Sequence, residues 1–143
     1  IEAMKACWTQ NDSQYHGKYV DFDAIWSWPK PVQKPHPPII MGAASSWGRE
    51  RVARYCDGWV PLPAQMKNID EEIADLEQRL QKHGRQLSDI EISFFWAPEN
   101  VDKLKRYRDM GIDRAILACP ADSEAATLQL LDKHASLMHA VAA

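Results

Sequence analysis

The sequence has 143 residues, which is enough for one domain with its own hydrophobic core. Its charge is mildly acidic, with 17 Lys and Arg against 20 Asp and Glu, and no basic run indicates a nucleic-acid surface. No apolar run is long enough to span a membrane and no stretch is typical of a signal peptide. We therefore expect neither a nucleic-acid partner nor a membrane partner.

The cysteine and histidine spacings indicate neither a disulfide framework nor a metal site. Cys7, Cys56 and Cys119 are odd in number, far apart and without C-x-x-C spacing. A reducing cytoplasm is the expected location, and no metal is expected. No metal-ligand spacing is found among the five histidines, which are His16, His36, His83, His134 and His139.

The chain begins at Ile1 inside a helical pattern. Ile1, Met4, Cys7 and Trp8 recur at the three- to four-residue spacing of one helix face. Because no capping residue precedes this pattern, we expect the natural chain to start earlier.

Residues 11–38 have a different composition, with five prolines and interleaved aromatic residues. Gly17–Phe22 is predicted to add one short strand. A loop of this length is usually functional or packed against another part of the protein, although any single aromatic residue here can equally well cover the core.

The next stretch, Pro37–Pro63, is typical of a strand, a turn, a helix and a second strand. Ile39–Met41 is a short apolar run, Gly42–Ser46 has almost no side-chain bulk, and a polar helix is predicted over Trp47–Tyr55. A small-residue turn that leads into a helix N-terminus favours anion binding, because the N–H groups of the first turn lack partners. Many such turns only cap a helix, so the pattern alone does not establish a ligand.

Three further strand and helix pairs are predicted. A strand begins over Trp59–Leu62. The helix that follows is capped by Asn68, ends at Gly84 and has a buried apolar stripe. A strand over Ile90–Trp96 and a helix ending at Gly111 follow. The predicted stripe residues of these two helices are Ile69, Ile73, Leu76 and Leu80, and Val101, Leu104 and Tyr107.

The last pair starts with a strand over Arg114–Cys119, which Pro120 ends. Asp122 or Ser123 is expected to cap the final helix. Its predicted buried face is formed by Leu128, Leu131, Ala135 and Met138.

This alternation predicts an α/β fold with parallel strands and right-handed crossovers. Four such units can form a small open sheet or half of an eight-stranded (β/α) barrel. The periodicity alone does not distinguish the two.

A longer pattern around the small-residue turn resembles the signature of the bacterial luciferase-like monooxygenase family, and most closely its branch of oxidoreductases that use the deazaflavin coenzyme F-420. The matching residues are Pro29, Pro31, Gln33, Pro37, Pro38, Ile39, Gly42, Ser45, Arg51, Arg54, Asp57, Gly58 and Trp59. The resemblance covers nearly the whole chain, which we take as one domain over residues 1–143, and aligns it with strands five to eight of a (β/α)8 barrel of the TIM type. It implies that the first four strands are missing, and that residues 11–38 are an excursion near the active-site mouth and the subunit contacts.

By this resemblance, the phosphate end of FMN or of the deazaflavin would bind at Gly42, Ala43, Ala44, Ser45 and Ser46. Arg51 matches a family arginine, which we interpret as structural and paired with Glu50 or Asp57 in preference to the alternative that it binds the phosphate. The sequence differs from the family at Ala43, where a second glycine is usual, and at Trp47–Gly48.

The strand ends offer no nucleophile with a base and no carboxylate pair, so the catalytic residues are unknown. This fits chemistry that a cofactor supplies. Trp96 is expected either to line the substrate pocket or to lie in the core.

The first hypothesis is an oxidoreductase or monooxygenase that transfers a hydride or an oxygen atom to an organic substrate in a whole homo-oligomeric enzyme. The alternatives are a self-associating half-barrel without activity and a small α/β module that binds a phosphorylated ligand. Neither the substrate nor the choice between FMN and deazaflavin can be predicted, and the isolated chain is expected to be weakly active or inactive.

Overall fold

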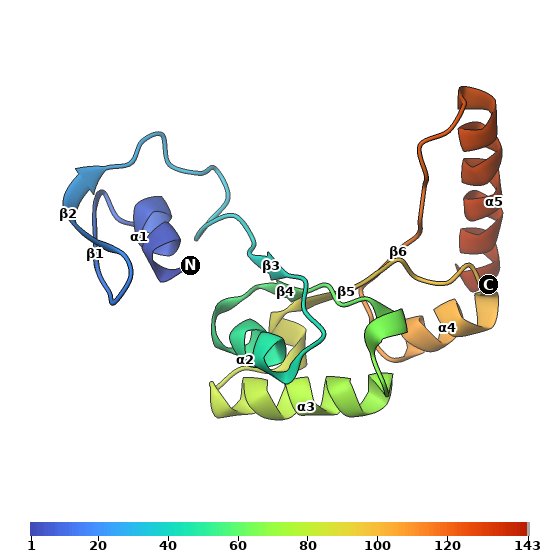
Figure 1. Cartoon of the computed structure of the whole chain (residues 1–143), viewed down its shortest axis with the longest axis horizontal. Helices are drawn as coiled ribbons and strands as arrows, with labels where there is room; N and C mark the ends of the chain where they lie inside the picture. Colours follow the sequence, from blue (N-terminus) through green and yellow to red (C-terminus); the bar gives the residue numbers. More distant parts are fainter. Residues whose placement is uncertain (143) are drawn as a thin grey trace. The chain divides into compact units, whose positions relative to one another are not determined.

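The computed structural model describes residues 1–142, and the chain divides into two compact units, Ile1–Ile39 and Ile40–Ala143. Figure 1 shows the elements of each unit. Within residues 1–142, none of the helices combines the length and the apolar character that crossing a membrane requires.

The first unit contains helix α1 (Glu2–Thr9) and the antiparallel strands β1 (Asp12–His16) and β2 (Asp21–Trp26). The helix is where the sequence predicts it. The predicted single strand over Gly17–Phe22 is wrong, because Gly17 starts a turn whose N–H donates to the Val20 carbonyl at 2.9 Å. The chain therefore folds back as a hairpin.

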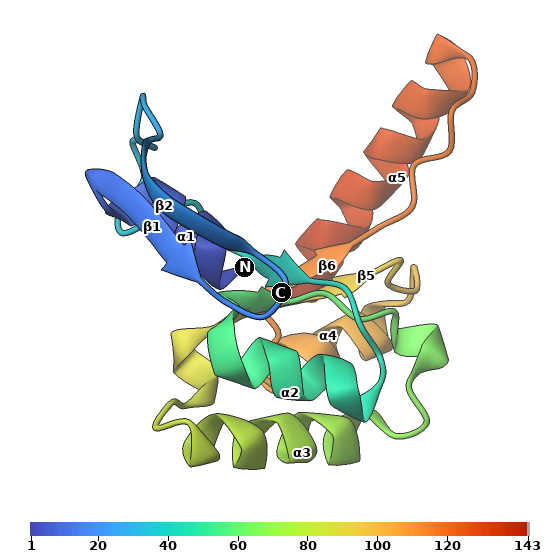
Figure 2. The same cartoon turned by 60° about the vertical axis from the view of Figure 1, so that its left-hand side comes forward.

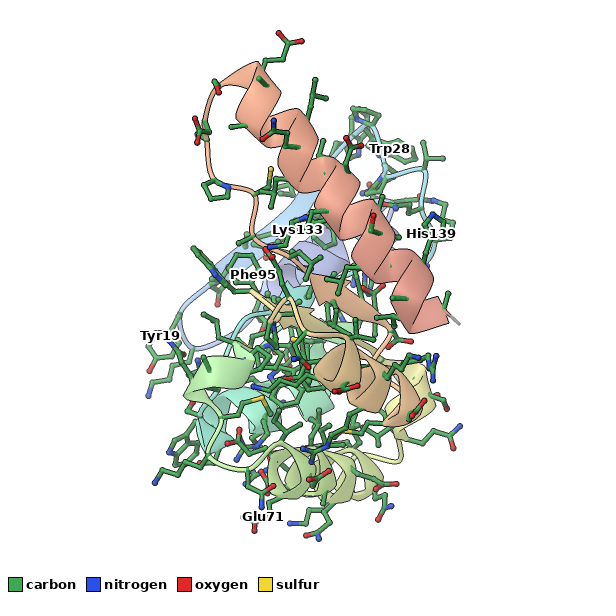
Figure 3. The ribbon with its side chains drawn as sticks, turned by 90° about the vertical axis from the view of Figure 1, so that its right-hand side faces the viewer. Tyr19, Trp28, Glu71, Phe95, Lys133 and His139 are labelled. Atoms are coloured by element: carbon green, nitrogen blue, oxygen red, sulfur yellow. The ribbon has the colours of Figure 1, made fainter. Side chains whose placement is uncertain are left out.

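The loop that follows the hairpin is fixed to α1 by a lysine. The Lys30 ammonium group donates to the Cys7 carbonyl at 2.7 Å and lies 5.2 Å from the centre of the Trp28 ring. Several large side chains of this unit remain exposed, among them Tyr19 and Trp28, which Figure 3 labels.

The second unit is built on one parallel sheet with the strand order β3-β4-β5-β6. The strands are β3 (Ile40–Met41), β4 (Gly58–Trp59), β5 (Glu91–Phe95) and β6 (Arg114–Ile116). Four parallel strands in chain order confirm the predicted alternation. The carboxyl ends of all four strands lie along the same end of the sheet, which we call its carboxyl edge. The outer strands β3 and β6 each have one side without a neighbouring strand in the described residues.

Four helices follow these strands in turn. They are α2 (Ser46–Tyr55), α3 (Ile69–Lys82), α4 (Val101–Asp109) and α5 (Glu124–Ala142). In Figure 2, α2 and α3 run side by side below the sheet. The predicted cap Asn68 is confirmed, since its side chain accepts from the N–H groups of Asp70 and Glu71.

The core of this unit lies between the sheet, α2, α3 and α4. Trp59, Phe94, Leu76, Leu80 and Val52 are fully buried. Burying one such side chain contributes about 1.5–3 kcal/mol, so this cluster accounts for a large part of the stability. The core therefore holds the carboxyl edge of the sheet rigidly.

The prediction for the buried face of α5 is wrong. Leu128, Leu131 and Met138 are exposed, whereas His134 is buried and Leu137 is half-buried. The helix packs against the rest of the unit through the face that carries His134 and Leu137, and His134 Nε2 lies 3.0 Å from Glu99 Oε1. Lys133, which projects from α5 in Figure 3, also donates to Glu99.

Candidate functional site

The five predicted site residues, Gly42 to Ser46, follow β3 directly and lead into α2. Ser45 caps the helix, because its hydroxyl oxygen accepts the N–H of Gly48 at 3.1 Å. The Ser45 carbonyl accepts the N–H of Arg49, which starts the helical ladder. The N–H groups of Ser46 and Trp47 belong to the first turn, so no carbonyl group within the helix accepts from them. The capping role also leaves the hydroxyl hydrogen of Ser45 able to donate.

Two core side chains hold the carbonyl groups of this turn. The Trp59 indole N–H donates to the Ala43 carbonyl at 2.7 Å, and Arg49 Nη1 donates to the Ala44 carbonyl at 2.9 Å. In a trans peptide the N–H points opposite to the C=O. The N–H groups of Ala44 and Ser45 therefore point away from Trp59 and Arg49, which are both buried.

Arg49 also connects α2 to α3. Its side chain donates to Glu72 at 2.8 Å and to Asp75 at 2.6 Å, and the residue is only 8% exposed. Burial by itself raises the pKa of the Asp75 carboxyl, but the hydrogen bonds from Arg79 and Arg49 outweigh it and hold that pKa below its ordinary value. The turn is thus anchored to an ion-pair network that stays charged at neutral pH.

The predicted partner of Arg51 is wrong. Glu50 binds Arg79 at 2.9 Å and His83 at 2.9 Å, and the hydrogen bond from His83 and then that from Arg79 lower the pKa of the Glu50 carboxyl. Arg51 is exposed and makes no ion pair with residues 1–142. Arg49 has the structural role that the sequence interpretation gave to Arg51.

The two departures from the family at Ala43 and Gly48 compensate each other, because the Ala43 methyl fills the space that a side chain at position 48 would need. A Cβ added at Gly48 would lie 2.3 Å from the Ala43 Cβ. The Ala43 methyl is therefore directed at the buried first turn of α2. At Gly42 an added Cβ would meet only the Val60 carbonyl, at 3.4 Å. No residue of the turn itself carries a bulky side chain, and Trp47, which follows it, is exposed.

Trp96 follows β5 at the same edge of the sheet. It is 63% exposed, so the alternative that places it in the core is wrong. Its φ is +58°, which is unusual for a bulky side chain. Hydrogen bonds on both sides fix this conformation, from the Phe95 N–H to the Pro61 carbonyl and from the Ala97 N–H to the Ile116 carbonyl. Strained residues of this kind gather at functional sites.

The structure describes no cluster of three or more His, Cys, Asp or Glu with metal-binding geometry in residues 1–142. The same part of the chain contains no disulfide, since Cys7, Cys56 and Cys119 do not pair with one another. What the carboxyl edge offers is therefore backbone N–H groups, hydroxyl groups and cationic and aromatic side chains.

The family profile described as luciferase-like monooxygenase matches residues 1–114. An uncharacterized protein of Mycobacterium tuberculosis is 36% identical over 135 residues, which cover 92% of this chain and 47% of that protein. The FMNH(2)-dependent dimethylsulfone monooxygenase of Pseudomonas putida is 30% identical over 84 residues, which cover 59% of this chain and 23% of that enzyme.

Among solved structures, the coenzyme F420 dependent tetrahydromethanopterin reductase from Methanopyrus kandleri superposes with a TM-score of 0.58 at 18% identity. The superposition covers 78% of this chain and 38% of the reductase. The fold is thus the mixed α/β arrangement of these larger proteins, over part of their length. The chain spans about half the length, 47%, of the mycobacterial relatives that it matches over 92% of its own length. With the profile matching residues 1–114, the chain belongs to the luciferase-like monooxygenase family.

Proposed function

We propose that this chain forms strands five to eight of a luciferase-like (β/α)8 oxidoreductase, and that the Gly42–Ser46 turn binds the phosphate group of FMN or of deazaflavin coenzyme F-420. One observation carries the cofactor site. Two buried donors hold the carbonyls of Ala43 and Ala44, so the N–H groups of Ala44 and Ser45 point away from the core. Together with the first N–H groups of α2 they form an anion-binding concavity.

The local chemistry suits a phosphate. The first turn of α2 contains no acidic residue that would compete with an anion for the helix N-terminus. The Ala43 methyl, which could obstruct a phosphate, is directed at Gly48 instead. The Ser45 hydroxyl keeps a hydrogen to donate.

The half-barrel assignment is supported by the open sheet and by the coverage of the relatives. The edge strand β3 exposes Ile40, and α5 exposes Leu128, Leu131 and Met138. In a closed barrel such apolar side chains would be covered by the remaining strands and helices. The whole enzyme would transfer a hydride from the deazaflavin, or use reduced FMN with dioxygen to oxygenate an organic substrate. Its thiols suit a reducing compartment such as the cytoplasm.

A self-associating half-barrel is the second candidate, and the same exposed apolar side chains favour it. Two copies could pair their open sheet sides and bury these residues. The exposed aromatic residues of the first unit, Tyr19, Trp26 and Trp28, offer a further contact surface for a homo-oligomer.

Fluorescence titration of the purified chain with FMN and with coenzyme F-420 tests the cofactor site. The decisive variant is Ser45→Asp, which places a negative charge at the turn. The matched control is Ser88→Asp, because Ser88 is exposed and lies outside the turn. We expect Ser45→Asp to weaken binding of one cofactor by about tenfold or more, which corresponds to about 1.4 kcal/mol, and Ser88→Asp to leave it unchanged.

Light scattering on the same samples distinguishes the two candidates. Cofactor binding by a monomer supports the site on the chain itself. A concentration-dependent dimer that binds neither cofactor would contradict the proposed cofactor site and support the self-associating half-barrel.

A further inference from the structure

A second concave site lies at the carboxyl edge of the sheet, one strand away from the Gly42–Ser46 turn. A pocket of about 330 Å³ opens between the segment after β4, which contributes Pro63, and the segment after β5, which contributes Trp96. Its third wall is helix α4, with Lys103, Arg106 and Tyr107. We call it the β4–β5 pocket. No interaction described above uses it.

Two cationic side chains line this pocket. Lys103 makes no ion pair with residues 1–142, so its ammonium charge is not neutralised by the described part of the chain. Arg106 is bound to Asp70 through one nitrogen, Nη2. Its guanidinium group has further N–H donors that this single bond does not occupy. The pocket thus carries a net positive charge from Lys103.

Tyr107 adds a neutral donor. The residue is only 6% exposed, and its ring packs edge-on against Phe94 with the ring centres 4.8 Å apart. Its hydroxyl makes no hydrogen bond with residues 1–142. Within these residues, every side-chain nitrogen or oxygen that is fully buried has a hydrogen-bond partner, so the Tyr107 oxygen is not fully buried. The Tyr107 hydroxyl oxygen is therefore accessible, in a residue that lines the pocket. Burial raises the pKa of this phenol, with Arg106 opposing the shift, so the hydroxyl keeps its proton at neutral pH.

Trp96 supplies an apolar wall. The hydrogen bonds on either side of it fix the backbone at φ +58° and hold a large aromatic side chain at 63% exposure beside the cationic groups. An exposed indole on a fixed backbone, next to the Lys103 ammonium group and the Tyr107 hydroxyl, is suited to a planar or apolar group that carries an anion.

We propose that the β4–β5 pocket binds the oxyanion group, phosphate or carboxylate, of an organic ligand whose apolar part lies against Trp96. Lys103, Arg106 and the Tyr107 hydroxyl donate to the oxyanion. The ligand is either an acidic substrate or a cofactor that reaches from the Gly42–Ser46 turn. Both kinds of ligand carry an oxyanion. They can be distinguished because different variants weaken the binding of each.

The test uses the ¹⁵N-labelled chain, titrated by NMR with inorganic phosphate and with phenyl phosphate. The indole N–H signal of Trp96, assigned by its absence in Trp96→Phe, reports on the pocket. We expect both ligands to shift this signal, and phenyl phosphate to bind about tenfold more tightly because its ring contacts Trp96. Equal affinity for the two ligands, or no shift of the signal, would overturn the assignment.

Three variants locate the anion. Lys103→Gln should weaken phenyl phosphate binding by about tenfold, and Tyr107→Phe, which keeps the ring packed on Phe94, by a smaller factor. Lys105→Gln is the control, since Lys105 lies on the same helix but does not line the pocket. Equal losses in Lys103→Gln and Lys105→Gln would mean general charge attraction, and would contradict the proposal.

The same variants separate this pocket from the proposed phosphate turn. Phenyl phosphate binding that is lost in Ser45→Asp and kept in Lys103→Gln would place the anion at the turn and overturn the pocket. Phenyl phosphate binding that is kept in Ser45→Asp and lost in Lys103→Gln supports the pocket, whether or not a cofactor binds at the turn. An FMN affinity that falls in both variants identifies the cofactor as the ligand, whereas an FMN affinity that falls only in Ser45→Asp identifies a separate acidic ligand.

Discussion

The methyl group of Ala43 occupies the space beside Gly48 that a side chain at position 48 would need. A Cβ added to Gly48 would lie 2.3 Å from the Ala43 Cβ, far inside van der Waals contact. The two residues are therefore coupled, and the glycine is required only because residue 43 is an alanine.

This coupling predicts a reversal of sign in a double-mutant cycle. Gly48→Ala should destabilise the chain by about 1–3 kcal/mol, because the added methyl overpacks a buried turn. In the Ala43→Gly background the same change should be neutral or stabilising by up to about 1 kcal/mol, since alanine is the better helix former. Urea unfolding of the four proteins measures the cycle. Additive effects of the two substitutions would show that the residues do not touch.

Arg49 and Arg51 form a matched pair of arginines on one helix. Arg49→Met should lower the free energy of unfolding by about 3 kcal/mol, because it leaves Glu72 without its buried cationic partner and Asp75 with Arg79 alone. It should also weaken cofactor binding, since the Ala44 carbonyl loses its donor. Arg51→Met should change stability by less than about 0.5 kcal/mol. Similar losses in the two variants would contradict the assignment of the anchor to Arg49.

The ion pairs between α2 and α3 predict an acid-sensitive fold. In the folded chain the pKa of the Asp75 carboxyl and that of the Glu50 carboxyl both lie below their ordinary values. A carboxyl whose pKa is lower in the folded state stabilises the fold above its unfolded pKa, and this contribution is lost as the pH falls through the folded pKa. Stability from these groups should therefore be complete above about pH 5 and decrease below it.

Urea unfolding between pH 7 and pH 3 measures this dependence. Asp75→Asn should be less stable than the parent at pH 6 and should lose less stability on acidification, because one of the responsible carboxyls is gone. Glu77→Gln is the control, since Glu77 is exposed on the same helix. A parent whose stability does not fall between pH 5 and pH 3 would show that the pairs contribute nothing.

The positive φ of Trp96 can be tested by comparing glycine with alanine at this position, since both substitutions remove the indole and only alanine keeps the backbone strain. At φ +58° a residue with a Cβ is strained by about 1–2 kcal/mol, and glycine is not. Trp96→Gly should therefore be more stable than Trp96→Ala by about 1 kcal/mol. At Phe95, inside β5, the order should reverse and alanine should be the more stable. The same order at both positions would argue against the left-handed conformation.

The order of elements in the second unit could be predicted because their end signals are local. Asn68 caps its helix as expected, Asn100 caps the next, and Gly84 and Gly111 adopt the positive φ values that helix ends favour. The turn at Gly42–Ser46 could also be placed, since strand, small residues and helix follow one another directly. What these residues bind remains a prediction.

Other features depend on contacts that the sequence does not show. The final helix contains two apolar stripes, and periodicity cannot decide between Leu131 and Leu137 as the packed position. Arg49 was missed because an arginine in a polar helix is usually exposed. The only signal was its position four residues after the capping Ser45, which brings it back over the turn. Lys103 and Tyr107 were missed as ligand-binding candidates because the pocket needs residues from two separate segments.

The anchoring of the turn by Trp59 and Arg49 also has a kinetic consequence. A loop that must first become ordered pays an entropic cost and often binds slowly, through a closing step. The shape of this turn is set by hydrogen bonds from the chain's own core, to the Ala43 and Ala44 carbonyls. Stopped-flow traces of an anion entering it should therefore be single-exponential, with an observed rate that rises linearly with ligand concentration and reaches no plateau.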